Sequence, residues 1–403
     1  MAAPLSIGLV AGEASGDTLG AHLIEALRAL VPEARFFGIA GPKMQAAGCE
    51  VWEPSESLAV MGLFEILRDL PRLLRLRARI RRRFLKERPD VFVGIDAPEF
   101  NLSVARALHE AGIPTVQYVS PQVWAWRQSR VHSMHESVDL VLCLLPFEKR
   151  FYDDQGLRAE FVGHPLADAI PLVVDRAAAR AQLKIAPEAQ VVALLPGSRR
   201  GEVTRLAADF AATARILAAR RPDLQFLAPM ANASVRAIFA DALARAAPEL
   251  RVLLLDGGAQ AALAAADVVL VASGTASLEA ALSKRPMVVV YRLGAMTAWV
   301  LRRLKLVKTK YFAQPNLLAD RRVVSEYFQE EIVPETIGAE LLMWLDDPTR
   351  RRELEEEFTR IHAGLRSGGS KSAALAILAL LDSLRPAAEA RPGEARTSGR
   401  RSA

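Results

Sequence analysis

The stretch VFVGIDAPEFN, residues 91–101, carries the strongest indication of the fold and contains the first candidate site. Residues 91–93 form an apolar run typical of a buried parallel strand. Asp96 then lies just past the carboxyl end of that strand, where open parallel sheets place their ligand chemistry. We predict that Asp96 is a general base, with helix capping as the alternative. Asn101 is expected to cap the following helix, and Glu99 is a second carboxylate nearby.

A second stretch of the same form is LLPGSRRGE, residues 194–202, in which an apolar strand enters a turn of small residues. Gly197 would let the backbone approach a phosphate closely, and Ser198 can cap a helix. Arg199 or Arg200 can neutralise a diphosphate and stabilise it as a leaving group. The pattern is neither the P-loop nor GxGxxG, so it indicates neither an ATPase nor a dehydrogenase.

The run SGTASLEAAL, residues 273–282, is a third strand-to-helix turn. Ser273, Gly274 and Thr275 open the helix, so free backbone N–H groups and the positive end of its dipole are available to a phosphate. Glu279, one turn further, can accept a hydrogen bond from a ribose hydroxyl. The alternative is an ordinary helix cap with a glutamate of the capping-box type.

Apolar strands alternate with helical patterns along the chain, which predicts βαβ units and parallel sheets. The expected strands are 5–11, 36–39, 90–95, 115–119, 139–144 and 160–162, then 191–195, 225–229, 251–255, 268–272 and 287–290. The expected helices are 18–30, 63–88, 102–111, 176–183, 203–219, 234–246 and those of the helical stretch 336–383. Ser15 or Asp17 is expected to cap the first of them, and Pro71 divides 63–88 or lies within it.

The fold class is therefore α/β, with two Rossmann-like domains facing a central cleft and a C-terminal helical segment. A length of 403 residues fits two domains. We expect an N-terminal domain for acceptor and membrane, a C-terminal donor domain, terminal helices and a disordered tail, at residues 1–170, 171–350, 351–384 and 385–403 respectively.

The composition excludes several classes of protein. Two distant cysteines, Cys49 and Cys143, argue against a disulfide framework and favour a reducing cytoplasm. His132 and His135 lack further ligands nearby, so we expect no metal site and no cofactor. The N-terminus does not read as a signal peptide, and no apolar run approaches the length of a membrane span.

The net charge of +6 gathers partly in residues 63–88, where arginines alternate with more apolar residues than one core-facing stripe needs. This pattern favours a helix lying on an anionic membrane surface, and residues 299–310 form a similar patch. The alternatives are a partner-helix face and plain core packing with solvated arginines. Nucleic acid is not expected as a partner, because the stretch has few aromatic residues and no recognition-helix pattern.

The aromatic segment YVSPQVWAWRQSR, residues 118–130, follows another strand. Trp124 and Trp126 lie at the strand exit rather than in a periodic core pattern. Contact with an acceptor and simple packing of the loop are both compatible with this position.

These motifs together resemble those of the lipid-A-disaccharide synthases, glycosyltransferases of the two-Rossmann-domain GT-B type. The resemblance runs in order from about residue 5 to about 380, through GEASGD (12–17), GIDAPEFN (94–101), SPQVWAWR (120–127), FVGHPL (161–166), LLPGSR (194–199), ASGTASLE (272–279), VKTKYF (307–312) and PNLLADR (315–321).

The resemblance implies transfer of 2,3-diacylglucosamine from UDP-2,3-diacylglucosamine to 2,3-diacylglucosamine 1-phosphate, giving a β-1,6 disaccharide and UDP. It also implies a peripheral location on the inner face of the cytoplasmic membrane and a possible homodimer with an exchanged C-terminal segment. No metal is required by the arrangement.

The resemblance also implies roles for individual residues. Asp96 corresponds to the catalytic aspartate, Arg199 to the phosphate-binding arginine and Asn316 to an asparagine close to the donor. Glu13 and Ser15, with the two tryptophans, are assigned to the acceptor, and Arg292 is a further candidate for holding the diphosphate.

Two positions depart from the family pattern. Glu99 stands where the family often has Asp, and the residues around Glu326 differ although the glutamate is retained. The rival functions are another GT-B enzyme, such as a polyprenyl-linked-sugar N-acetylglucosaminyltransferase or a UDP-sugar epimerase, and a non-catalytic nucleotide-binding or membrane-peripheral protein.

Overall fold

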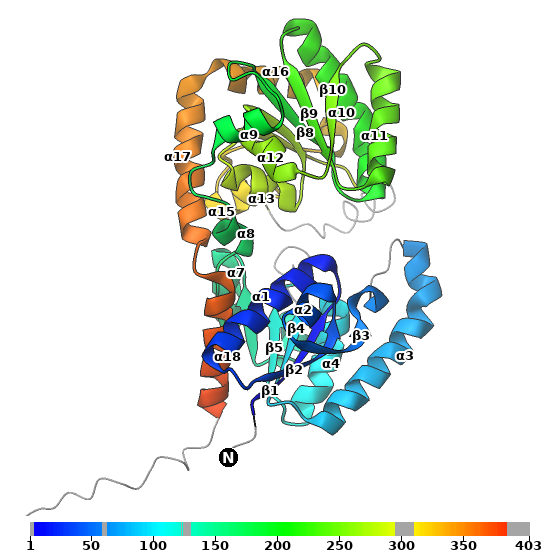
Figure 1. The fold of residues 1–403 in the computed structure, drawn as a ribbon, viewed down its shortest axis with the longest axis vertical. Helices are drawn as coiled ribbons and strands as arrows, with labels where there is room; N and C mark the ends of the chain where they lie inside the picture. Colours follow the sequence, from blue (N-terminus) through cyan, green and yellow to red (C-terminus); the bar gives the residue numbers. More distant parts are fainter. Residues whose placement is uncertain (1–3, 59–62, 122, 124–129, 295–309, 385–403) are drawn as a thin grey trace, which may run out of the picture. The chain divides into compact units, whose positions relative to one another are not determined.

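The computed structural model in Figure 1 describes most of the chain, namely residues 4–58, 63–121, 123, 130–294 and 310–384, without the side chains of Ala14 and residues 63–69. Its contacts divide the chain into two compact units. The first runs to Tyr118 and also contains Glu136–Leu140 and the last helix from Lys371. The second contains Val119–His135 and Val141–Ser370.

Seven of the described strands form the first sheet, in the order β3-β2-β1-β4-β5-β6-β7. Their bounds are β1 Ser6–Ala11, β2 Arg35–Ala40, β3 Cys49–Pro54, β4 Val91–Ile95, β5 Thr115–Tyr118, β6 Leu140–Cys143 and β7 Ala159–Phe161. β1 pairs in parallel with β2 on one side and with β4 on the other. Every residue of β4 is buried, as expected for a strand covered on both faces.

Another six described strands form a parallel sheet in the order β10-β9-β8-β11-β12-β13. Their bounds are β8 Val191–Leu195, β9 Gln225–Met230, β10 Val252–Asp256, β11 Val268–Ala272, β12 Met287–Tyr291 and β13 Ser325–Phe328. Figure 1 shows α10 (Arg200–Arg220) and α11 (Ala233–Ala246) on one side of this sheet and α12 (Ala259–Ala265) on the other.

Each sheet reverses its strand order beside one central strand. The chain moves outward from β1 to β3 and returns to β4 on the far side of β1, and it repeats this path from β8 to β10 and back to β11. The carboxyl ends of β1 and β4, and those of β8 and β11, therefore flank the two switch points at which open α/β sheets bind ligands.

The remaining helices confirm the α/β class and the C-terminal helical segment. Those up to β8 are α1 Ala14–Leu30, α2 Pro42–Ala46, α3 Leu63–Glu87, α4 Pro98–Glu110, α6 Arg130–His135, α7 Pro146–Asp154, α8 Pro165–Ala169 and α9 Arg176–Gln182. Those after β11 are α13 Thr275–Leu282, α15 Gln314–Ala319, α16 Pro334–Asp346, α17 Pro348–Leu365 and α18 Gly369–Leu384. Pro71 lies inside the single helix α3.

The sequence did not predict the edge strands β3 and β13. Both lack the buried apolar pattern of the central strands, because edge strands are only partly covered. The domain division at residue 170 stays a prediction. Although β7 pairs in the first sheet, the division by contacts assigns β7 and α8 to the second compact unit.

The expected cap of the first helix is wrong. α1 starts at Ala14, four residues earlier than predicted, so Ser15 and Asp17 lie inside it. The buried Asp17 carboxylate instead accepts hydrogen bonds from the backbone N–H groups of Gly41 (2.9 Å), Lys43 (3.0 Å) and Met44 (3.0 Å). It thereby satisfies the free N–H groups at the start of α2.

Substitution of Asp17 by alanine should therefore loosen α2. We expect Asp17→Ala to lower the free energy of unfolding by about 2 kcal/mol, because three buried N–H groups lose their acceptor. Amide hydrogen exchange should accelerate most at Gly41, Lys43 and Met44. Asp223→Ala, at an exposed position, is the control and should change stability by less than about 0.5 kcal/mol. Unchanged exchange at the start of α2 would contradict this role.

Candidate active site

Asp96 lies in a strained turn at the switch point of the first sheet. β4 ends at Ile95, and the next two residues, Asp96 and Ala97, have φ angles of +53° and +39°. The left-handed region costs a non-glycine residue about 1 kcal/mol or more, so neighbouring groups must hold this turn. Asp96 is half-buried.

Asn101 holds the Asp96 turn from within α4. The buried Asn101 Nδ2 donates to the carbonyl oxygen of Asp96 at 2.8 Å and lies 3.3 Å from that of Ile95. Gln117 Nε2 donates to the same Asp96 carbonyl at 3.1 Å. The expectation that Asn101 caps the helix is wrong, since α4 already begins at Pro98 and Asn101 is its fourth residue.

The GEASGD segment lies beside this turn because β1 and β4 pair in parallel up to Ala11 and Ile95. A Cβ atom on Gly12 would lie 2.9 Å from that of Ala97, so only glycine fits between the two loops. Glu13 and Ser15, both exposed, begin α1 at this edge of the sheet. The fold thus brings three of the predicted site residues of the first unit, Asp96, Glu13 and Ser15, to one edge.

LPGSR occupies the corresponding place in the second sheet. β8 ends at Leu195, and Gly197 adopts a φ of +123° before α10 starts at Arg200. Ser198 and Arg199 are exposed at the amino end of the helix. Within the described part of the chain, the Arg199 guanidinium makes no hydrogen bond or ion pair, so it is available to an anionic ligand.

Glu202 is a residue of this turn that the sequence reasoning missed. Its Oε2 accepts the N–H of Ser198 at 3.2 Å, and a Cβ atom on Gly197 would lie only 2.2 Å from it. Burial raises the pKa of Glu202, against the lowering effect of the Ser198 and Arg199 N–H groups. A carboxylate therefore occupies N–H groups that could bind a phosphate. Its position in the sequence could have indicated this role, because Glu202 is the third residue after the helix N-cap, where a glutamate commonly accepts N–H groups of the turn.

The SGTASLE turn lies next to LPGSR, since β8 and β11 pair in parallel with Leu195 opposite Val271. Gly274 is the N-cap of α13 with a φ of +155°, and Thr275 is exposed at its first position. Burial raises the pKa of Glu279, and its carboxylate forms no hydrogen bond or ion pair with other described residues. This half-buried carboxylate has capacity for a hydroxyl donor.

Asn316 and Glu326 organise the segment that follows. Ser273 Oγ donates to the carbonyl of Phe312 at 3.1 Å. Glu326 Oε2 accepts the N–H groups of Phe312 and Ala313 at 2.9 and 2.7 Å. The amide of Asn316, fully buried, bonds with the backbone of residues 323–324, and these bonds make it a positioning residue. Direct contact of Asn316 with a donor stays a prediction.

The diphosphate role of Arg292 stays a prediction, and two other candidate residues lie outside the described part of the chain. The Arg292 guanidinium forms an ion pair with Asp209 at 2.7 Å and donates to the carbonyls of Arg205 and Gln329, so it joins α10 to the end of β13. Trp124 and Trp126 lie outside the described residues. Among the residues described, no group of three His, Cys, Asp or Glu side chains could hold a metal ion, and no helix is long and apolar enough to cross a membrane.

Solved structures share this fold at low sequence identity. A UDP-GlcNAc 2-epimerase from Neisseria meningitidis, bound to UDP-GlcNAc, aligns with a TM-score of 0.60 and 12% identity over 93% of this chain and 100% of its own. A glycosyltransferase from Rickettsia africae aligns with a TM-score of 0.57 and 10% identity over 94% and 99%. These likenesses support the fold alone.

Sequence relatives are much closer. The lipid-A-disaccharide synthase of Serratia proteamaculans is 52% identical over 377 residues, 94% of this chain and 98% of the relative. That of Yersinia pseudotuberculosis is 51% identical over 379 residues, 94% and 96% of the two chains. The family model described as lipid-A-disaccharide synthetase matches residues 7–380. The chain therefore belongs to the lipid-A-disaccharide synthase family of glycosyltransferases.

Proposed function

We propose that this chain transfers 2,3-diacylglucosamine from UDP-2,3-diacylglucosamine to the 6-hydroxyl of 2,3-diacylglucosamine 1-phosphate by inverting displacement, with Asp96 as general base. The observation that carries the mechanism is the half-buried Asp96 carboxylate in a strained turn at a switch point. The acceptor oxygen bonds to the anomeric carbon while the bond from that carbon to the UDP oxygen breaks. Asp96 takes the hydroxyl proton.

The donor side supplies positive charge to the departing UDP. The Arg199 guanidinium makes no hydrogen bond or ion pair in the described region, and the N–H groups that open α10 and α13 add partial positive charge. Gly197, Ser198, Ser273, Gly274 and Thr275 form the two turns that would bind the diphosphate. In this proposal Glu279 accepts a ribose hydroxyl, and Asn316 fixes the adjoining segment.

The acceptor side combines the Asp96 edge with a membrane surface. Glu13 and Ser15 would contact the acceptor sugar phosphate, together with Trp124 and Trp126. Leu76, Ile80 and Phe84 of α3 are buried, which agrees in part with the core-packing alternative for this helix.

A second face of α3 carries exposed leucines that could contact a membrane. Leu70 and Leu74 are one turn apart and 42% and 43% exposed, and Arg81, also exposed, lies two turns beyond Leu74. Apolar side chains flanked by arginines suit an anionic bilayer, which would hold both acylated substrates. We therefore propose a peripheral location on the inner face of the cytoplasmic membrane. A homodimer is also proposed, and light scattering in detergent tests it.

Replacement of the base tests the mechanism directly. Asp96→Asn should lower kcat by about two to four orders of magnitude with little change in the KM for the donor, because binding is retained while proton transfer is lost. Mass spectrometry of the disaccharide measures both constants, and Asp223→Asn is the matched control. An Asp96→Asn variant that keeps kcat within about fivefold of the wild type would require another base.

Replacement of Glu202 tests whether the diphosphate takes the N–H groups of the LPGSR turn. Glu202→Gln should lower the Kd for UDP-N-acetylglucosamine about fivefold, because a like charge is removed and a diphosphate displaces a neutral amide oxygen from the Ser198 N–H more readily than a carboxylate. Isothermal titration calorimetry measures this, and Glu249→Gln, at an exposed position, is the control.

The same contact predicts a pH dependence. The pKa of Glu202 is raised by burial, and a bound diphosphate would raise it further, so binding takes up a proton. Affinity of the wild type should therefore increase as the pH falls from neutrality towards that pKa, and Glu202→Gln should lack this increase. Weaker binding by Glu202→Gln at neutral pH would mean that the carboxylate orders the turn instead of competing with the ligand.

Substitutions on α3 test the membrane surface. The double variant Leu70→Ser/Leu74→Ser should bind vesicles of phosphatidylglycerol and phosphatidylethanolamine about tenfold more weakly in sedimentation, because two inserted side chains are lost. Leu253→Ser is the control, since Leu253 is 44% exposed but lies on the edge strand β10. Equal binding by the double variant and the control would remove α3 from the membrane contact.

A further inference from the structure

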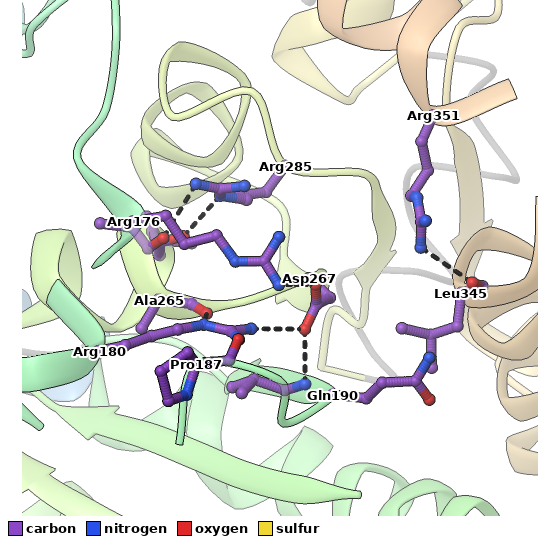
Figure 2. Close-up of polar contacts among 12 residues, drawn as sticks. Arg176, Arg180, Pro187, Gln190, Ala265, Asp267, Arg285, Leu345 and Arg351 are labelled. Atoms are coloured by element: carbon purple, nitrogen blue, oxygen red, sulfur yellow. Dashed lines mark hydrogen bonds and ion pairs between the residues drawn. The ribbon is translucent and has the colours of Figure 1, made fainter. Parts of the chain in front are cut away.

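A cavity of about 220 Å³ lies at the amino end of the second sheet. Four arginines line it, Arg176, Arg285, Arg351 and Arg352, together with the carboxylates of Asp267 and Glu355. Figure 2 shows Asp267 between the Arg176 and Arg285 side chains on one side and Arg351, from α17, on the other. All of these residues belong to the second compact unit.

The cavity is separate from the predicted donor turns. Asp267 immediately precedes β11, whereas Ser273 immediately follows it. A strand of five residues spans about 16 Å, so the two places lie at opposite ends of the sheet. Nothing in the proposed transfer reaction uses this end.

Asp267 neutralises only part of the positive charge. Its carboxylate forms ion pairs with Arg176 and, at 2.8 Å, with Arg180, and it accepts the N–H of Val191 at 2.7 Å. Arg285, Arg351 and Arg352 have no carboxylate within ion-pair distance among the described residues, and Glu355 forms no ion pair there either. The cavity therefore has an excess of positive charge.

Arg285 gives the strongest evidence for an anionic ligand, because this residue is only 8% exposed. Nε and Nη2 donate to the carbonyls of Leu263 and Ala264, each at 2.9 Å, at the end of α12. This helix-capping role uses two of the five N–H groups of a guanidinium. A buried cation without a paired anion is costly, and burial lowers the pKa of Arg285 to about 10, so it stays charged at neutral pH.

The Arg351 side chain adds donors from a second direction. Its Nη1 donates to the carbonyl of Leu345 at 2.9 Å, which holds the side chain while other N–H groups remain. Arg351 and Arg352 are the fourth and fifth residues of α17, near the amino end, where the helix dipole also favours an anion. Planar guanidinium groups bind phosphate oxygens through paired hydrogen bonds.

We propose that this arginine cavity, lined by Arg176, Arg285, Arg351 and Arg352, binds a compact phosphate-bearing anion of the diphosphate class. Its volume is below the range of about 300–1,000 Å³ that sites for drug-sized ligands occupy, which favours an inorganic or similarly small ligand. The excess positive charge favours a ligand with more than one negative charge. The site is independent of the donor turns and of the proposed reaction.

Calorimetric titration of the full-length chain with sodium pyrophosphate, at constant ionic strength and with UDP present in excess, tests the site. UDP is included to occupy the predicted donor turns, so that pyrophosphate binding there cannot account for the signal. We expect pyrophosphate to bind in the presence of UDP and to bind more tightly than inorganic phosphate, because it carries more charge. Arg351→Gln/Arg352→Gln should raise the Kd for pyrophosphate about tenfold or more, since two cationic contacts are lost.

Arg220→Gln is the matched control, since Arg220 is exposed at the end of α10 and does not line the cavity. It should leave the Kd within about twofold. A second measurement tests the buried residue Arg285. Pyrophosphate should raise the melting temperature of the wild type, whereas it should not raise that of Arg285→Gln, whatever the stability of this variant without ligand.

Two results would overturn the proposal. One is displacement of pyrophosphate by UDP with no effect of Arg351→Gln/Arg352→Gln, which would put pyrophosphate at the donor turns. The other is no binding of pyrophosphate or phosphate at millimolar concentration by a folded wild-type chain.

Discussion

The whole arrangement depends on the reversal of strand order beside β1 and beside β8. Parallel pairing of β1 with β4 forces the GEASGD and Asp96 turns to lie side by side, and pairing of β8 with β11 does the same for LPGSR and SGTASLE. In each pair, one turn follows the central strand, β1 or β8, and the other follows the strand on its far side, β4 or β11. Residues about 80 positions apart in sequence thus share one edge.

Backbone groups at these edges are fixed by a few buried or half-buried polar side chains. Asn101 and Gln117 hold the carbonyl of Asp96, Asp17 holds the start of α2, and Glu326 holds residues 312–313. Each side chain satisfies main-chain groups that no strand or helix pairs, and buried polar groups of this kind must be satisfied. The side chains proposed for chemistry, Asp96 and Arg199, can stay open to reactants because others form the scaffold.

Much of this could be predicted from the sequence, because central parallel strands are buried on both faces and read as continuous apolar runs. VFVGI and VVALL are examples, and the turns after them were correctly expected at the sheet edge. The edge strands β3 and β13 were missed because CEVWEP and SEYF are only partly covered. The roles of Asp17 and Gln117 depend on partners 27 and 21 positions away in the sequence, which local patterns do not contain.

The central claim is an inverting glycosyl transfer, and the anomeric configuration of the product tests it most directly. Purified wild-type protein is incubated with UDP-2,3-diacylglucosamine and 2,3-diacylglucosamine 1-phosphate, and the product is examined by mass spectrometry and NMR. The account predicts a 1,6-linked disaccharide 1-phosphate in the β configuration, together with one UDP for each disaccharide. Absence of the disaccharide, or an α linkage, would contradict it.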